Sequence, residues 1–256
     1  MSTSPFAPSP ASGERRVALV NDAGFYVGPA LAREFARRGH DLVLGDPAEG
    51  LVDELAELGA AVEVVTGVRN LAKPESAPAL VAAGLERFGK IDSAVAFSGQ
   101  IIPGRFLRSS VDDLHKLMEG CIEGPYHFLK ATAAAMVEQG HGQIVLITSA
   151  AGGRVTPGAP LYSAVRAGAT MLARNVADEI ARTGVQVNAL GTNFMDFPEF
   201  HEATGTSDPA IRALFEAQVP MRRFGTLEEF AAFSMAFLDG TSGFTTGQFV
   251  SYAGGW

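Results

Sequence analysis

The feature that most constrains this chain is an alternation, from Arg16 onward, of short apolar runs rich in β-branched residues with longer amphipathic stretches. Parallel strands need long crossover connections, so this alternation is typical of repeated βαβ units with a sheet buried on both faces. The predicted strands span residues 17–20, 41–44, 61–65, 93–97, 143–148, 186–190 and 248–252. We therefore expect an α/β fold, a single Rossmann-like, doubly wound parallel β-sheet flanked by helices.

The first helix is predicted from about Pro29 to Arg38. Proline is tolerated in a first helical turn, and Leu31 and Phe35 share one apolar face. Gly39 is expected to end the helix, because glycine readily adopts the left-handed conformation found there.

The regular alternation fails between residues 192 and 220. An irregular, apolar insertion after the carboxyl end of a strand is a common place for a substrate lid. We predict one catalytic domain over residues 16–256, with a lid at about 192–220. Residues 1–15, rich in Ser and Pro, are expected to form a disordered lead-in.

Composition excludes several classes of function. The 256 residues carry 20 Lys and Arg against 28 Asp and Glu, with no basic run, so nucleic acid is not an expected partner. The lone Cys121 cannot form an intrachain disulfide, which favours a reducing, cytoplasmic setting. The N-terminal stretch contains no continuous apolar segment, so a membrane anchor is not expected there.

No metal site is expected either, because the histidines lack a second ligand at metal spacing. Solvated or capping roles are predicted for all five, His40, His115, His127, His141 and His201.

Residues 21–28 directly follow the first strand and precede the helix, the position of a phosphate-binding loop. The segment resembles the Thr-Gly-x-x-x-Gly-x-Gly turn of the short-chain dehydrogenases, with Asp22 and Tyr26 in place of the first two glycines and only Gly28 retained. A tyrosine would fill the volume of a pyrophosphate and a carboxylate would repel it, so no dinucleotide is expected. In the alternative, a variant loop binds the dinucleotide in a shifted pose, with Asp46 on its ribose; otherwise Asp46 is a solvated turn residue.

Ser149 follows the predicted strand 143–148, at the sheet edge where parallel α/β folds bind ligands. Tyr162 comes thirteen residues later and Arg166 four after that, which places phenol and guanidinium on one helix face. A nearby fixed cation favours the phenolate, so Tyr162 is a candidate general base. The alternative is a surface cation packed over an aromatic ring.

A strand-end Ser followed at this interval by Tyr-x-x-x-Arg resembles the active site of short-chain dehydrogenases, which have Tyr-x-x-x-Lys. Arg166 replaces the lysine that holds the nicotinamide ribose in that family, and Cys121 replaces a helix Asn. Residues 96–99 replace an Asn-Asn-Ala-Gly segment that supports the cofactor. The features that serve the cofactor are changed, while the acid/base pair is kept.

With these departures the chain resembles the halohydrin dehalogenases, a branch of that superfamily without a nucleotide. Their second motif, Thr-x-x-x-x-Phe/Tyr-x-Gly, matches residues 21–28 except that Asn21 replaces Thr. Residues 191–198, together with Tyr26, most resemble the G-type subgroup, which is associated with bulky and cyclic epoxides. The ending, residues 246–256, resembles the superfamily's last strand and implies a homotetramer.

The resemblance implies reversible, cofactor-free conversion of vicinal halohydrins to epoxides and halide, and epoxide opening by azide, cyanide or nitrite. Ser149 would hold the substrate oxygen, Tyr162 would take its proton, and Arg166 would keep Tyr162 acidic. The implied halide-binding residues are Tyr26, Thr192, Asn193, Phe194 and Met195. Those implied to border the organic substrate are Gln100, Ile102, Ala151, Thr156, Phe197 and Phe200. Core packing under a lid is the alternative role for the halide set.

Two other functions stay open. Ser149 and Tyr162 would also serve carbonyl reduction by an NAD(P)-dependent oxidoreductase with a variant phosphate loop. A binding-only relative is disfavoured, because packing alone does not require Ser, Tyr and Arg together. Asp196 and Glu199 could bond a substrate, but solvated loop charges are the favoured interpretation.

Overall fold

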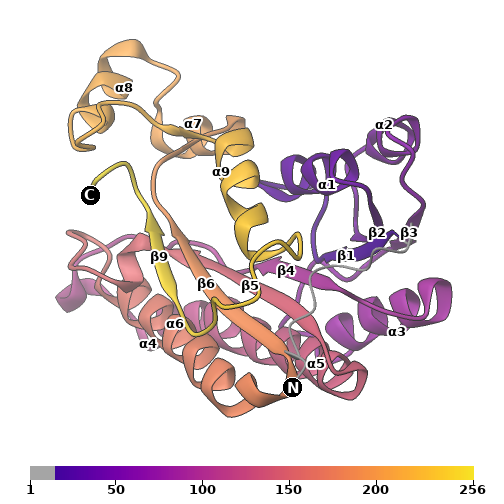
Figure 1. Cartoon of the computed structure of the whole chain (residues 1–256). Coiled ribbons are helices and arrows are strands. Elements are labelled where there is room, and N and C mark those ends of the chain that lie inside the picture. The colour runs from indigo at the N-terminus through magenta and orange to yellow at the C-terminus, as the bar shows by residue number, and fades with distance from the viewer. Residues whose placement is uncertain (1–14) are drawn as a thin grey trace.

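A parallel sheet of seven strands, in the order β3-β2-β1-β4-β5-β6-β9, forms the centre of the computed structural model, which describes residues 15–256 (Figure 1). The strands are β1 (Arg16–Val20), β2 (His40–Gly45), β3 (Val62–Val65), β4 (Ser93–Phe97), β5 (Gly142–Ser149), β6 (Val185–Thr192) and β9 (Phe249–Tyr252). Each matches a predicted strand, so the expected fold class is confirmed. The predicted lead-in lies, apart from Arg15, outside the described residues.

Helices cover both faces of this sheet (Figure 1). One face carries α1 (Gly28–Arg37), α2 (Leu51–Glu57) and α9 (Leu227–Ser234). The other carries α3 (Ser76–Phe88), α4 (Val111–Met118), α5 (Gly124–Gln139) and α6 (Pro160–Ile180). Shorter turns are η1 (Phe106–Arg108), the π-helical η2 (Glu119–Glu123), η3 (Ala150–Gly152), η4 (Ala181–Thr183) and η5 (Met235–Phe237). No helix within residues 15–256 is both long and apolar enough to span a membrane.

Helix α1 follows the predicted pattern. Leu31 and Phe35 are fully buried, and Gly39 follows the helix at φ 78°. Gly28 begins the helix, and a Cβ there would lie 1.9 Å from the carbonyl oxygen of Asp22. This glycine is therefore required by the packing of the turn against its own helix, whether or not a phosphate binds.

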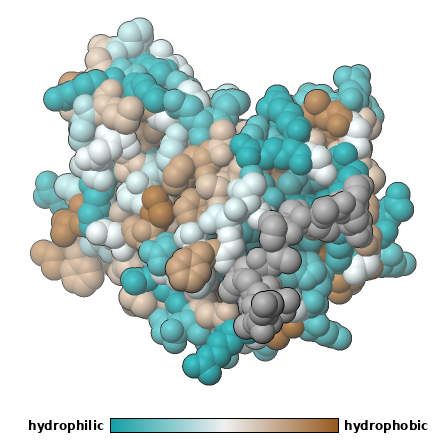
Figure 2. All heavy atoms as spheres, viewed as in Figure 1, coloured by the Kyte–Doolittle hydropathy of each residue, from teal (hydrophilic) through white to brown (hydrophobic). Residues whose placement is uncertain are grey.

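The segment predicted as a lid contains β7 (Met195–Asp196), α7 (Pro198–Thr204) and α8 (Pro209–Glu216). Strand β7 pairs in parallel with the short β8 (Gly225–Thr226). Helices α7 and α8 project from the body of the molecule in Figure 1, and Figure 2 shows a notch between them and the α1–α2 side. Aromatic rings hold the segment together, with the Phe194 and Phe215 centroids 5.2 Å apart.

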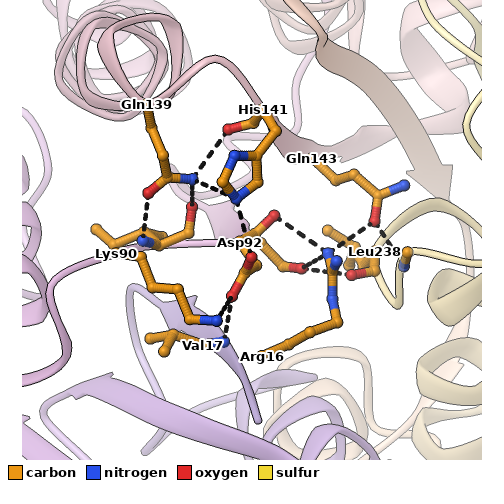
Figure 3. A network of polar contacts seen from close by, with 11 residues as sticks. Arg16, Val17, Lys90, Asp92, Gln139, His141, Gln143 and Leu238 are labelled. Atoms are coloured by element: carbon orange, nitrogen blue, oxygen red, sulfur yellow. Dashed lines mark hydrogen bonds and ion pairs between the residues drawn. The ribbon is translucent and has the colours of Figure 1, made fainter. Parts of the chain in front are cut away.

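A buried polar network closes the amino edge of the sheet, opposite the candidate site (Figure 3). Asp92, only 4% exposed, accepts the Val17 N–H at 2.8 Å and pairs with His141 Nε2 at 3.1 Å. Arg16 donates from Nη2 to Gln143 Oε1 at 3.3 Å. These bonds join β1, β4 and β5, so the network anchors the central strands.

Two histidines, His40 and His201, depart from the solvated or capping roles predicted for all five, whereas the His141 side chain is 52% exposed. His40 is 2% exposed, with its ring centroid 5.1 Å from that of Phe35. His141 pairs with Asp92, and His201 pairs with Asp196 at 2.7 Å. Among residues 15–256 there is no group of three or more His, Cys, Asp or Glu side chains that could hold a metal ion.

Candidate active site

Ser149 is the last residue of β5, at the carboxyl edge of the sheet. Its Oγ accepts the Ala151 N–H at 3.2 Å and donates to the Thr192 carbonyl oxygen of β6 at 3.5 Å. Both neighbours are residues that the sequence resemblance assigned to the site. The hydroxyl is thus held where β5 and β6 end.

Tyr162 and Arg166 lie one turn apart on α6, as predicted, with the Arg166 guanidinium carbon 5.1 Å from the centroid of the Tyr162 ring. Arg166 is 6% exposed and donates from Nη2 to the Ser98 carbonyl oxygen at 2.8 Å. A Cβ on Gly152 would lie 2.8 Å from the Arg166 carbonyl carbon. The turn that follows Ser149 therefore packs directly on the α6 backbone, which brings the three predicted catalytic residues into one region.

The charge of Arg166 has no carboxylate partner among residues 15–256. Burial opposes its charged form, but the nearby Tyr162 and Cys121 groups outweigh this and raise the pKa of Arg166. Burial also raises the pKa of the Cys121 thiol, so the thiol stays protonated near neutral pH. Tyr162 is thus the main polar side-chain partner of the buried guanidinium.

Close backbone packing explains how Ser98 reaches Arg166. Gly99 has φ 77°, and a Cβ there would lie 2.4 Å from the Cys121 sulfur. A Cβ on Gly120 would lie 2.6 Å from the Gly99 Cα. The loop after β4 therefore lies directly on the π-helical turn η2, and π-helical turns are frequent at functional sites.

The turn between β1 and α1 contains Tyr26 at φ 53°, a left-handed conformation that favours glycine. Asn21 joins this turn to β4, accepting the Phe97 N–H at 3.0 Å and donating to the Phe97 carbonyl at 3.3 Å. The Tyr26 ring centroid lies 4.8 Å from that of Phe197. Burial raises the pKa of the Tyr26 hydroxyl, opposed by a hydrogen bond from Thr192, so Tyr26 is a neutral phenol.

Two carboxylates near this turn are engaged within the protein. Asp22 is 2% exposed, accepts the Gly24 N–H at 3.0 Å and pairs with Arg69 Nε at 2.8 Å; burial raises its pKa. Asp46 accepts the backbone N–H groups of residues 67–69 at 2.6, 2.9 and 2.7 Å. Asp46 is a partly exposed turn residue, and its oxygens also fix the loop after β3.

The predicted halide residues occupy two places. Tyr26 and Thr192 are in contact. Asn193, Phe194 and Met195 line a cavity of about 240 Å³ whose remaining walls come from residues 219–225 and 252–254. Ser149, Tyr162 and Arg166 are not among the residues that line this cavity. The structure therefore brings two of the five halide candidates together and directs three toward a separate cavity.

The predicted substrate residues are also divided. Ile102 packs in the same apolar cluster as Tyr162, and Ala151 bonds Ser149. Phe197 lies against Tyr26, whereas Phe200 belongs to the aromatic cluster of the lid.

The last two substrate candidates lie apart from these. The Thr156 hydroxyl is buried without a hydrogen-bond partner in the described chain. Gln100 lines a separate cavity of about 380 Å³. Phe25 and Phe97 form an aromatic wall there, with ring centroids 6.2 Å apart, that the sequence analysis did not assign. Their positions, Phe25 shortly after β1 and Phe97 at the end of β4, could have indicated it.

Comparison with known proteins identifies the family. Residues 24–256 match the family model described as Enoyl-(Acyl carrier protein) reductase. Oxidoreductase UcpA of Escherichia coli (strain K12) is 30% identical over 241 residues, covering 91% of this chain and 90% of that protein. The 3-oxoacyl-[acyl-carrier-protein] reductase of Synechocystis sp. (strain ATCC 27184 / PCC 6803 / Kazusa) is 30% identical over 247 residues, covering 94% and 96%.

Solved structures agree with this assignment. A gluconate 5-dehydrogenase from Burkholderia cenocepacia J2315 in complex with NADP and tartrate superposes with a TM-score of 0.83 at 26% identity, covering 94% of each chain. An NAD+-bound xylitol dehydrogenase gives a TM-score of 0.84 at 25% identity, covering 94% of this chain and 98% of that one. The chain belongs to the short-chain dehydrogenase/reductase superfamily.

Proposed function

We propose that this protein is a cofactor-independent halohydrin dehalogenase, which converts vicinal halohydrins to epoxides and halide and opens epoxides with small anions. One observation carries the proposal. Tyr26, a half-buried side chain at positive φ, stands at a glycine position of the phosphate loop, while Ser149, Tyr162 and Arg166 are retained. A site that keeps its acid/base groups but fills its phosphate position favours chemistry without hydride transfer.

The residues near the turn do not fit a dinucleotide. A pyrophosphate needs free backbone N–H groups at the start of α1, but the Asp22 carboxylate takes the Gly24 N–H and adds negative charge. Asp46, the carboxylate nearest to a ribose position, already accepts three backbone N–H groups, which leaves little of its acceptor capacity for a diol. The Tyr26 ring and its aromatic neighbours occupy the adjoining space.

In the proposed reaction, Ser149 donates a hydrogen bond to the substrate oxygen while Tyr162 removes the hydroxyl proton. The alkoxide oxygen then attacks the neighbouring carbon, forming a C–O bond as the carbon–halogen bond breaks and halide leaves with the electron pair. Arg166 stabilises the phenolate form of Tyr162. In reverse, Tyr162 protonates the epoxide oxygen as an anion attacks carbon.

Tyr26 and Thr192 can hold the anion. The Tyr26 and Thr192 hydroxyls are within hydrogen-bonding reach of each other, and an anion bound beside them would take the Tyr26 O–H as a donor. Because Tyr26 remains protonated, it presents a donor and adds no negative charge. Aromatic ring edges, which carry positive partial charge, surround it.

The finer features of this proposal come from the sequence resemblance. We infer bulky or cyclic epoxides as substrates from residues 191–198 together with Tyr26. We infer a homotetramer from the C-terminal sequence, residues 246–256. Light scattering on the purified chain would test the assembly.

The test is halide release from vicinal bromo- and chloroalcohols by nucleotide-free protein, comparing the native chain with Tyr162→Phe. The proposal predicts release by the native chain and a loss of about 10²-fold or more in the variant, the usual contribution of a general base. Equal rates in both proteins would refute Tyr162 as the base.

An NAD(P)-dependent oxidoreductase is the second candidate, favoured by the names of the relatives and by the NADP and NAD+ in the two solved structures. NADH and NADPH titrations of the purified protein separate the two functions. Saturable binding near micromolar concentration, with turnover of a ketone, would establish this candidate in place of the dehalogenase.

A further inference from the structure

We propose that Asp196 is a positioning residue that latches the lid, residues 192–220, over the site and thereby controls binding of the attacking anion. The inference rests on the proposed function for its kinetic consequence only. The latch itself comprises Asp196, His201 and Arg212.

Asp196 receives bonds from both lid helices. His201 Nε2, on α7, lies 2.7 Å from Asp196 Oδ1, and Arg212 Nη2, on α8, donates to Oδ2 at 2.7 Å. Partial burial favours the neutral acid, but the bonds from Arg212 and His201 outweigh it and lower the pKa of Asp196. One carboxylate, ionised near neutral pH, thus joins α7 and α8 to β7.

A second layer of bonds orients His201. A carboxylate can only accept, so Nε2 carries a proton, and Nδ1 lies 2.8 Å from the Thr206 hydroxyl. Thr206 is 1% exposed and lies 2.8 Å from the Thr204 hydroxyl, which donates to the Phe200 carbonyl. The α7 end of the latch is thereby fixed in direction as well as distance.

The two neighbours of Asp196 tie β7 to the core and to the site. Met195 is 1% exposed and packs in the apolar core beneath α1. Phe197 contacts Tyr26, with ring centroids 4.8 Å apart. A latch at Asp196 therefore holds the Tyr26–Phe197 contact, which forms one wall of the proposed anion site.

Glu216, the other carboxylate bound by Arg212, offers a matched control. The Arg212 Nε donates to Glu216 at 2.8 Å within α8, and the Arg212 guanidinium carbon lies 4.8 Å from the centroid of the Phe224 ring. Removing the Glu216 charge leaves the Asp196 bonds intact. An effect specific to the latch must therefore appear on changing Asp196 and be absent on changing Glu216.

The catalytic groups lie on other elements. Ser149 ends β5, and Tyr162 and Arg166 lie on α6. Loosening the lid should therefore weaken anion binding and leave the chemical step intact, which is a separation between KM and kcat. A purely structural role would instead lower the amount of active protein without moving KM.

The experiment compares full-length Asp196→Ala, Asp196→Asn and Glu216→Gln with the native chain. Amide hydrogen exchange is followed in peptides from residues 197–216 and from β5, together with KM and kcat for azide in epoxide opening. Asp196→Ala should raise lid exchange and the azide KM about tenfold, with β5 exchange unchanged and kcat within about twofold. Asp196→Asn should be intermediate, since its amide oxygen can still accept one bond, and Glu216→Gln should match the native chain.

Native-like lid exchange in Asp196→Ala would overturn the latch, as would equal loosening of β5 or an equal effect of Glu216→Gln. A raised lid exchange with an unchanged azide KM would overturn its role in anion binding. If the native chain opens no epoxide, the proposed function fails, but the exchange comparison still decides whether Asp196 latches the lid.

Discussion

The Tyr26 ring lies 4.8 Å from the Phe197 ring, a contact that joins the first βα turn to the lid across the carboxyl edge of the sheet. In the family's phosphate loop, glycine stands at the position of Tyr26. In the proposed function, this ring forms an aromatic wall where the family's loop presents backbone to a phosphate. The proposed function depends on this replacement of a glycine by Tyr26.

The Tyr26 hydroxyl should matter more than its ring for anion binding. Tyr26→Phe keeps the packing on Phe197 but removes the O–H donor beside Thr192. We expect the KM for azide or bromide to rise about tenfold, the usual effect of losing one hydrogen bond to a charged group, with kcat within about twofold. Steady-state kinetics measure this KM, and an unchanged value would show that the anion does not bind at the Tyr26 hydroxyl.

Arg166→Lys should fail as a conservative replacement. The guanidinium reaches the Ser98 carbonyl with Nη2 and still lies beside the Tyr162 ring, a geometry that an ammonium cannot reproduce. We expect kcat/KM for halide release to fall about 10²-fold with little change in the thermal midpoint. Native activity in this variant would show that charge alone suffices.

Acid should destabilise the protein through His40. Burial, then the charge of Arg16, lower the pKa of His40 to about 4 from 6.5. As pH falls from about 6.5 to about 4, the unfolded chain takes up a proton that the folded chain refuses, so stability present above pH 6.5 is lost in that window. The loss attributable to His40 is at most about 3 kcal/mol.

Urea unfolding at pH 7 and pH 4.5 tests this expectation in His40→Leu. The variant should lose less stability between the two pH values than the native chain does. His115→Gln, at an exposed position on α4, is the control and should follow the native chain. An equal loss in His40→Leu would assign the acid sensitivity to other groups.

Much of the fold could be predicted from sequence because its determinants are local. Strand runs, the α1 pattern and the shared face of Tyr162 and Arg166 depend on residues close together in the chain. Asp46 could not be placed in this way, since its partners at residues 67–69 follow the next strand. Because the ends of adjacent parallel strands meet in space, the bonds from residues 67–69 to Asp46 could still have been inferred from the strand order. The Asp196 bonds to α7 and α8 could not, because their sequence separations follow no regular period.

The predicted halide-binding residues show the same limit of prediction from sequence. Residues 192–195 are consecutive, yet the structure directs Thr192 to Tyr26 and Asn193 to a cavity shared with residues near the C-terminus. Side chains alternate between faces where a strand continues, and β6 ends at Thr192. Sequence position alone therefore could not separate the two groups.

The network at the amino edge should govern stability without affecting catalysis. Asp92→Asn removes the charge that faces His141 and one acceptor near the Val17 N–H (Figure 3). We expect a loss of about 2 kcal/mol in unfolding free energy, with unchanged KM and kcat. Asp53→Asn, on the exposed side of α2, is the matched control and should cost nothing measurable.

The central claim is that Ser149, Tyr162 and Arg166 act without hydride transfer. Its most direct test is the product balance of a single reaction, halide and epoxide formed from a vicinal bromoalcohol by protein stripped of nucleotide. The dehalogenation reaction should release one bromide for each epoxide formed, at a rate unchanged by added NADPH. No bromide release, together with NADPH oxidation in the presence of a ketone, would contradict this claim.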